Sequence, residues 1–419
     1  MKKLSLLSQI KIGIAAGIEL GLIFGKQIGG IEIIGNIFLK LVQMAVVLLI
    51  LGSVIEAIGT LKSEQFGRMG IKTMLLFLGT TALAAVVGLA IGYVTNPGLG
   101  IHLTHATTHI TAVHTTLSKT ILNFIPDNIF SSLASGNIIQ VIIFAIFFGT
   151  ALQMLNKNGH FQSILNGVHQ LNQITVKIIS MIMLTAPIGI GALIANVIGT
   201  SGLVVILPLP KFLFTFAVGT GLFLLLLFSI VHLYTKVPIK SLLKGFSRMM
   251  IVALTTTSSA ICLPIEMQDA KEKLGVDRQT ADLVLPLGMS LKSNGLAMFL
   301  ALSCLALAQM YGLNFGLPFM TKIVLLAILA CLGTVVVPGG GLVALTIVVP
   351  TLGLPTSSIA ILASIEWFSG MFRTILNVVG DTTTAMLISE SEHRLNLAPD
   401  HRSPIPSEPV EAQDPQKEI

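Results

Sequence analysis

Charged residues are scarce in this chain, and their scarcity argues against a soluble fold. Only 11% of the 419 residues are Asp, Glu, Lys or Arg, whereas 53% are hydrophobic. Soluble domains usually contain about 25% charged residues. The net charge of +6 does not indicate nucleic-acid binding, because the basic residues lie in short segments between apolar runs, which is the pattern of loops in membrane proteins. We therefore expect a polytopic membrane protein with no nucleic-acid partner.

Cysteine is also rare, and the chain lacks the motifs of metal centres and enzymes. Cys262, Cys304 and Cys331 lie in or beside apolar segments, without metal-ligand spacing. We expect them to be packing residues, and we expect neither a resident metal nor a cofactor. There is no nucleophile–base pair and no phosphate-binding loop. The sequence therefore indicates a protein that is not an enzyme.

Apolar runs of about 20 residues predict eight transmembrane helices. Two further stretches, about 241–277 and 318–355, are interrupted by TTTSSA with Leu263-Pro264 and by VVVPGGG. Paired interrupted segments are typical of transporter binding sites, so we predict two re-entrant helical hairpins. The predicted fold class is an all-α membrane protein. Its spans are expected near residues 8–25 (a first helix rather than a signal peptide), 36–59, 70–95, 120–155 (broken), 173–200, 204–233, 281–311 and 357–390.

Lysine and arginine predict the orientation in the inner (plasma) membrane. With both termini in the cytoplasm, three basic clusters fall on the inner side: residues 2–11, 62–72 and 236–248. The segment 391–419 is rich in Pro and charge and is expected to be a disordered cytoplasmic tail. The loop with His102, His105, His109 and His114 would then be external. No thiolate or carboxylate joins these histidines, so we favour a solvated loop over a metal or pH-sensing site.

Three polar residues in the last apolar segment carry the strongest functional signal. Arg373, Asn377 and Asp381 recur every four residues within SGMFRTILNVVGDTTTAMLI, which places them on one face of a regular helix. Charged groups at membrane depth usually face a substrate or ion route. The structural alternative is a buried Arg–Asp pair that holds two helices together.

Several ordered motifs resemble the glutamate/aspartate transporter family, the dicarboxylate/amino acid:cation symporters. The resemblance covers about residues 5–392 and implies a homotrimer with a fixed scaffold and a mobile transport domain. Residues 1–235 would be mainly the trimerisation scaffold, with the third span partly in the transport domain, and 236–390 would be the transport domain. The motifs are SLASGNIIQVIIFAIFFGTAL (132–152), APIGIGALIA (186–195), TSSAICLP (257–264), LVLPLG (283–288), VPGGG (337–341) and MFRTILNVVGD (371–381).

The resemblance also implies a substrate site between the hairpin tips and the last helix. Arg373 matches the residue that binds a second substrate carboxylate in the family, which indicates an anionic substrate. Hydroxyls and free amides at a helix start can bind the other carboxylate. The implied substrate-binding residues are Ser258, Ser259, Pro338, Gly339, Gly340, Arg373, Thr374 and Asn377.

Gly370 departs from the pattern of acidic amino-acid carriers, which place an aspartate there to meet the substrate ammonium. Dicarboxylate members also lack an acid at this position. This difference favours a dicarboxylate such as succinate or fumarate, since an unpaired buried ammonium is costly. Glu366, one turn earlier, offers an alternative partner for an amino group. If Glu366 instead engages Arg373 internally, neutral amino acids or cystine remain alternatives.

The implied sodium sites are altered. The family run Asn-Met-Asp-Gly-Thr here reads Lys292-Ser293-Asn294-Gly295-Leu296, and a third-helix tyrosine reads Phe77. We hypothesise that the Lys292 ammonium replaces a sodium ion beside Asp381, which matches a sodium-binding carboxylate; the alternative is that Lys292 extends to water. Sodium or a proton remains the candidate coupling ion. The implied cation or coupling residues are Lys292, Asn294, Asn377, Asp381, Thr80 and Thr81.

Glu266 is the candidate proton carrier, because Leu300 occupies the position of the family's proton-carrying glutamate. A buried acid can carry a proton, although we favour a solvated hairpin residue. Taken together, the sequence predicts a secondary active transporter of acidic amino acids or C4-dicarboxylates, with an elevator-type mechanism and altered sodium coupling. The alternative class is an anion-conducting facilitator or channel.

Overall fold

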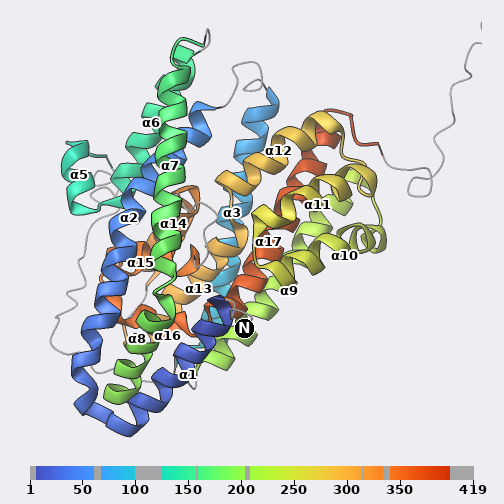
Figure 1. Ribbon diagram of the computed structural model, residues 1–419. Coiled ribbons are helices and arrows are strands. Elements are labelled where there is room, and N and C mark those ends of the chain that lie inside the picture. Colours follow the sequence, from blue (N-terminus) through green and yellow to red (C-terminus); the bar gives the residue numbers. More distant parts are fainter. Residues whose placement is uncertain are drawn as a thin grey trace, which may run out of the picture.

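The computed structural model describes residues 6–60, 68–99, 125–156, 159–202, 208–313, 316–333 and 340–396. Within these ranges every regular element is a helix, as Figure 1 shows, which confirms the all-α prediction. The helices of the first half are α1 (Leu6–Phe24), η1 (Gly25–Ile31), α2 (Glu32–Gly59), α3 (Arg68–Thr95), α5 (Ile129–Ser135), α6 (Ile138–Leu155), α7 (Gln162–Met183), α8 (Ala186–Ser201) and α9 (Pro208–Thr235).

Four helices in the described residues are long and apolar enough to cross a membrane, or up to six if each bent pair forms one span.

The second half of the chain contains shorter and more often interrupted helices. The helices of this half are α10 (Ile239–Thr256), α11 (Ser259–Glu272), α12 (Arg278–Leu291), α13 (Asn294–Met310), α14 (Leu317–Gly333), α15 (Gly340–Thr351), η4 (Thr356–Ser358), α16 (Ile359–Ala363) and α17 (Glu366–Ser391).

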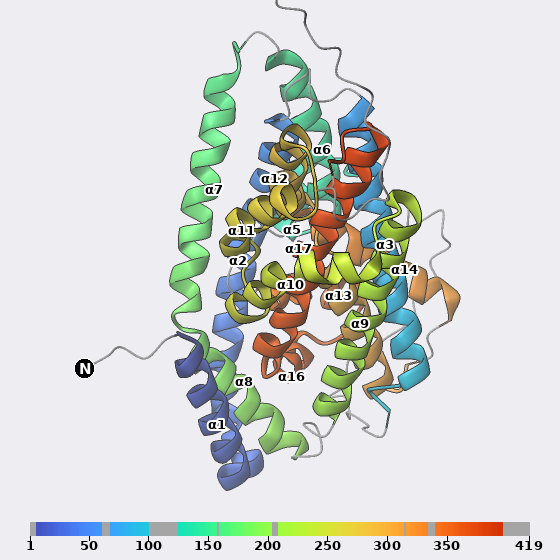
Figure 2. The same ribbon diagram turned by 90° about the vertical axis from the view of Figure 1, so that its right-hand side faces the viewer.

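The fifth predicted span differs most from its expected bounds. The helical segment begins at Gln162 rather than near residue 173, and it bends by 54° between α7 and α8. The bend falls at Thr185, and Pro187 lies in the first turn of α8. Proline has no amide hydrogen to donate and is tolerated at a helix start, so it marks where the second helix begins. Figure 2 shows α7 along one side of the molecule, opposite α3 and α14.

The first interrupted stretch forms a helix–turn–helix unit, as the hairpin prediction required. Thr257 ends α10 in a left-handed conformation with φ of 50°. Ser258 then caps α11 by accepting a hydrogen bond from the amide of Ile261, which is the usual role of serine at a helix start. The second stretch supplies α14 and α15, whereas the intervening residues lie outside the described residues. The same holds for Pro338, Gly339, the histidines at 102–114 and the tail from residue 397 onward.

The two segments that carry the predicted site are both broken. The expected span at 281–311 consists of α12 and α13, which are separated by the extended residue Lys292 and by Ser293. The last span is bent by 81° between α16 and α17. Arg373, Asn377 and Asp381 all lie within α17, so their predicted helical spacing is confirmed. The breaks place polar backbone beside these side chains.

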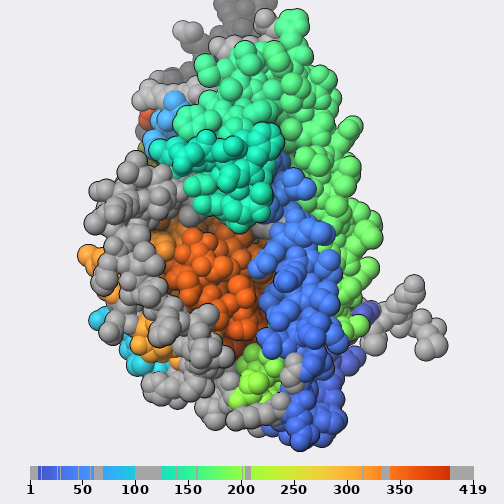
Figure 3. Space-filling view, turned by 90° about the vertical axis from the view of Figure 1, so that its left-hand side faces the viewer, coloured from blue at the N-terminus to red at the C-terminus, as the bar shows by residue number. Residues whose placement is uncertain are grey.

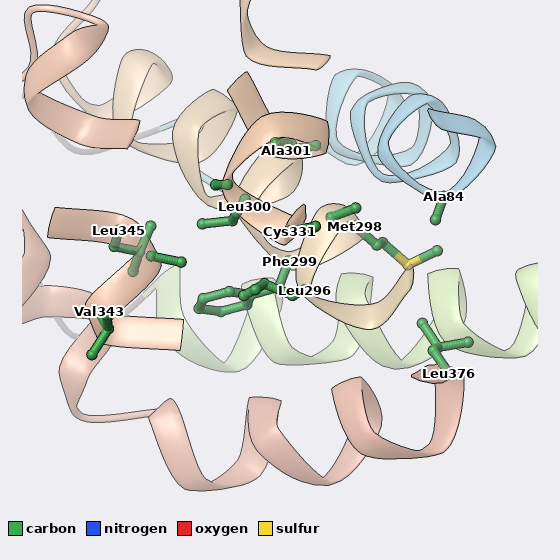
Figure 4. Close-up of a cluster of buried hydrophobic side chains, with 14 of the residues drawn as sticks. Ala84, Leu296, Met298, Phe299, Leu300, Ala301, Cys331, Val343, Leu345 and Leu376 are labelled. Atoms are coloured by element: carbon green, nitrogen blue, oxygen red, sulfur yellow. The ribbon is translucent and has the colours of Figure 1, made fainter. Parts of the chain in front are cut away.

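Helix α13 forms the centre of the molecule, and all 17 of its residues are buried. A helix that is apolar on every side requires neighbours on every side. Figure 4 shows Leu296, Met298 and Phe299 among side chains from α3, α15 and α17. In Figure 3, the orange atoms of the α14–α16 region lie between α2 in blue and α5 and α6 in teal, and α14 contacts both α2 and α6. Helix α17 packs directly against the central helix α13.

Candidate functional site

Arg373 forms an ion pair within its own helix. Its Nη2 donates to Glu366 Oε1 at 2.5 Å, and the two side chains are 11% and 13% exposed, respectively. The guanidinium also lies over the Phe299 ring, 4.8 Å from the centroid. Planar guanidinium groups favour such stacking. The alternative of an Arg373–Asp381 pair is therefore wrong, since each residue pairs with another partner.

The turn between α10 and α11 and the start of α15 both lie near this pair. The amide of Gly341, in the first turn of α15, donates to Glu366 Oε1 at 3.1 Å. A Cβ at Gly341 would overlap Arg373 Nη1 and lie 2.7 Å from Glu366 Oε2, so only glycine leaves room for the guanidinium. At the tip of the first hairpin, Thr257 Cβ lies 3.8 Å from where a Cβ of Gly370 would lie. The turn of the first hairpin and the start of α15 thus each approach the first turns of α17, at Gly370 and at Glu366 respectively.

The predicted substrate residues occupy this region to different degrees. Ser259 is buried at the first tip and Ser258 is half-buried. Gly340 begins α15, next to Gly341. Thr374 is buried and donates its hydroxyl to the carbonyl of Gly370 at 2.9 Å, so in this conformation it bonds within its own helix.

Lys292 and Asp381 form a second and completely buried ion pair. The distance from Lys292 Nζ to Asp381 Oδ1 is 3.0 Å, and both side chains are 0% exposed. The expectation that Lys292 lies near Asp381 is confirmed, and the alternative that it reaches water is wrong. The Phe77 ring centroid lies 5.5 Å from the same ammonium, at a distance that favours a cation–π interaction.

Glycines make room for this second pair. A Cβ at Gly380 would lie 2.6 Å from Lys292 Nζ, and one at Gly288 would lie 2.5 Å from Asp381 Oδ1. Within the described part of the chain, Asp381 Oδ2 has no hydrogen-bond partner. Buried polar atoms are normally satisfied, so this oxygen is an unfilled hydrogen-bond acceptor.

Glu266 is buried, which contradicts the expectation of a solvated hairpin residue. It is only 1% exposed, and its Oε1 accepts a hydrogen bond from Thr382 Oγ1 at 3.0 Å. The difference arises because α11 packs against α17 and turns this side chain inward. Glu266 therefore faces the residue next to Asp381. The acid of α11 that the sequence singled out, Glu266, thus lies in the same polar interior as the Lys292–Asp381 pair.

The remaining predicted coupling residues connect α3, α13 and α17. Thr81 donates to Asn294 Oδ1 at 3.3 Å, and Asn377 Oδ1 accepts from the amide of Gly295 at 2.8 Å. Thr80 is buried, but its hydroxyl donates to the carbonyl of Leu76 in its own helix. The structure thus brings Thr81, Asn294 and Asn377 to the broken start of α13 and leaves Thr80 with an intrahelical bond.

Comparison with known proteins agrees with this geometry. The model of the sodium:dicarboxylate symporter family matches residues 6–391. The chain belongs to this family. It is 32% identical over 400 residues to a proton/glutamate-aspartate symporter of Bacillus subtilis, with 94% of this chain and 96% of the relative covered. It is 30% identical over 402 residues to a C4-dicarboxylate transport protein of Rhizobium leguminosarum, with 93% and 90% covered.

Membership of the sodium:dicarboxylate symporter family makes the protein a transporter rather than an enzyme. Sequence reasoning placed Gly341 at the second hairpin tip but missed the hydrogen bond from its amide to Glu366, and it missed the ring of Phe299 beside Arg373. Phe299 carries no charged or reactive side chain, so no motif marks it. The VPGGG run was the available signal for Gly341, because close backbone approach to a side chain requires glycine.

Proposed function

We propose that the protein is a secondary transporter that carries small anionic solutes, acidic amino acids or C4-dicarboxylates, across the inner (plasma) membrane. The family and the names of the two relatives support this substrate range. The position of Arg373 supports it further, because the start of α15 packs against the guanidinium and Thr257 of the first hairpin lies near Gly370, about one turn away. A guanidinium binds carboxylates through parallel hydrogen bonds.

The proposal includes the architecture implied by the family resemblance. Eight spans and two re-entrant hairpins would form a homotrimer, with residues 1–235 as scaffold and 236–390 as an elevator-type transport domain. The contacts of α17 with α10, α11, α12, α13 and α15 support a common mobile unit, and α17 also packs against α3 and α9 from the first 235 residues. The basic clusters support cytoplasmic termini.

The Lys292–Asp381 pair is the observation that carries the proposed change in coupling. Its ammonium lies 3.0 Å from the carboxylate that would otherwise bind sodium. A second cation at the same oxygen would be repelled, because like charges in a buried site interact strongly. We therefore propose that a built-in cation replaces one sodium ion and that sodium dependence is weak or absent.

Charge balance supports a proton as the coupling ion. Glu266, Asp381 and Lys292 are all buried and together comprise two carboxyl groups and one amine. With all three ionised the cluster would carry one uncompensated negative charge, which is costly in a buried site. One proton on Glu266 makes the cluster neutral while Thr382 still contacts its side chain. The relative named as a proton/glutamate-aspartate symporter supports this assignment.

Two other functions remain as defined alternatives. The Arg373–Glu366 pair neutralises the guanidinium internally, which favours neutral amino acids or cystine as a second candidate substrate class. An anion-conducting facilitator or channel would show neither saturable uptake nor counterflow. A carrier shows both.

The proposal is tested by uptake of labelled L-aspartate into liposomes that contain the purified protein, with external sodium or choline and with or without an inward proton gradient. We expect uptake that is saturable, blocked by excess succinate, indifferent to sodium and stimulated by the gradient. Lys292→Asn should then gain sodium stimulation, because Asp381 would regain room for an ion. Lys72→Asn, which removes a half-buried lysine paired with Glu392, is the matched control. Strict sodium dependence of the wild type would overturn the built-in cation.

A further inference from the structure

We infer that Glu366 selects substrates that carry an amino group, so that the transported solute is an amino acid rather than a dicarboxylate without one. This inference rests on the proposed function and narrows its substrate class. Glu366 begins α17 and lies one turn before Gly370, the position where the resemblance leads us to expect an acid. Gly370 alone favours a dicarboxylate, whereas the contacts of Glu366 favour the opposite choice.

Only one of the two carboxylate oxygens of Glu366 has hydrogen-bond partners in the described residues. Its Oε1 accepts from Arg373 and from the amide of Gly341. Its Oε2 is buried and has no hydrogen-bond partner within the described residues. A buried carboxylate oxygen without a donor is unfavourable, and an ammonium group provides three donors. The unfilled oxygen therefore points to a ligand that supplies a donor.

Arg373 lacks a hydrogen-bond acceptor, just as Glu366 lacks a donor. Its Nε is also buried and without a partner in the described part of the structure. A guanidinium nitrogen can only donate, so its missing partner is an acceptor such as a carboxylate. The pair thus offers one free acceptor and one free donor, held together by their own 2.5 Å hydrogen bond. A solute with both an ammonium and a carboxylate satisfies both groups at once.

A dicarboxylate satisfies only half of this pair. Succinate has acceptors for Arg373 but no donor for Glu366, and its charge would be repelled by the Glu366 carboxylate. L-Aspartate is the same four-carbon diacid with one added amino group. Sites that are built to hydrogen-bond a polar group reject the analogue that lacks it, because the protein group is then left unpaired. Aspartate and succinate are therefore the sharpest pair of probes.

Gly370 offers a place to move the carboxylate. A Cβ at Gly370 would lie 3.4 Å from Arg373 Nη2 and 3.8 Å from Thr257 Cβ, both of which are ordinary or nearly ordinary contacts. An aspartate at this position would reach the same space from one helical turn away. Gly370→Asp can thus replace the function of Glu366 without a backbone clash.

The experiment measures inhibition of labelled L-aspartate uptake by unlabelled L-aspartate and by succinate in proteoliposomes. In Glu366→Gln we expect the apparent affinity for L-aspartate to fall about tenfold or more, because a charge-assisted hydrogen bond is lost. The affinity for succinate should stay the same or rise. Glu366→Gln/Gly370→Asp should restore the preference for aspartate. Asp282→Asn, which removes a carboxylate paired with Lys271 at the surface, is the control.

The outcomes separate this inference from the function on which it rests. Wild-type protein that takes up neither solute would overturn the proposed function. If the wild type carries L-aspartate but Glu366→Gln weakens both ligands equally or neither, the inference alone is overturned. Recovery in the double variant would show both that the single variant is folded and that the carboxylate, rather than the glutamate position, determines the preference.

Discussion

Helix α17 carries two buried ion pairs that differ in every respect relevant to transport. The Lys292–Asp381 pair joins two segments 89 residues apart and is completely shielded from water. The Arg373–Glu366 pair lies within one helix, remains 11% and 13% exposed, and also binds the amide of Gly341. The first pair is enclosed where α12 meets α17, whereas the second lies beside the start of α15.

The difference in exposure indicates different roles for the two ion pairs, although both join a carboxylate to a cationic side chain. The fully buried pair has no exposed atoms that could exchange partners with a solute, and under the proposed function it is the fixed charge that replaces a sodium ion. A partly exposed pair with unfilled donor and acceptor atoms can exchange partners when a solute arrives. Because a buried pair contributes little net stability while intact but is costly to break, the two pairs should respond very differently to the same substitution.

The largest effect is expected when the sealed pair is broken from one side. Asp381→Asn leaves the Lys292 ammonium buried without its carboxylate, which should cost about 3–5 kcal/mol of folding free energy. The measurement is the unfolding temperature of the purified protein in detergent. Glu366→Gln makes the same chemical change in the partly exposed pair and should lower this temperature less, since water still reaches it.

A second substitution distinguishes the loss of a partner from damage to the fold. Lys292→Met/Asp381→Asn removes both charges of the pair and should recover most of the lost stability, because no unpaired ammonium remains. If Asp381→Asn unfolds at the wild-type temperature, the 3.0 Å contact is not an ion pair in the protein, and the contrast between the two sites fails.

The next largest effect is expected at the start of α15, which contacts the partly exposed Arg373–Glu366 pair. Gly341→Ala would place a methyl group against Arg373 Nη1 and 2.7 Å from Glu366 Oε2. Since the guanidinium is the end of a flexible side chain, we expect it to be displaced, with a cost of about 1–3 kcal/mol typical of overpacking. The apparent affinity for L-aspartate in uptake should fall by about tenfold or more.

Gly370→Ala is the matched control for this substitution, because its added methyl group has no neighbour closer than 3.4 Å. It should change the apparent affinity by less than about threefold. Equal effects of the two alanines would mean that the start of α15 does not meet the Arg373–Glu366 pair as described.

The sequence predicted the all-helical fold, for reasons that are local. Hydrophobic runs predicted helices, and the four-residue spacing placed Arg373, Asn377 and Asp381 within one helix, α17, as observed. The sequence could not predict which partners these residues choose. Arg373 pairs with Glu366 because α15 and Phe299 hold the guanidinium on that side. Such choices depend on contacts between distant segments, which leave no periodic signal.

Glu266 illustrates the same limit. Its isolated position beside apolar residues did not distinguish a solvated side chain from a buried one, since the outcome depends on how α11 packs against α17. The break at Lys292 was also missed: Lys292, Ser293 and Asn294 interrupt the run, but the stretch at 281–311 is apolar enough overall to be interpreted as one span. In both cases tertiary packing determines burial.

The smallest effect on stability is expected for Glu266→Gln, which makes the same acid-to-amide change as Asp381→Asn. If Glu266 holds a proton beside the Lys292–Asp381 pair, Glu266→Gln replaces a neutral acid by a neutral amide of similar shape. The unfolding free energy should then change by less than about 1.5 kcal/mol, since Thr382 can still donate to the amide oxygen. Stimulation of uptake by an inward proton gradient should nevertheless disappear, because the amide cannot bind and release a proton. Uptake that still responds fully to the gradient would remove Glu266 from the coupling mechanism, and a large loss of stability would indicate that the side chain is a buried anion paired with Lys292.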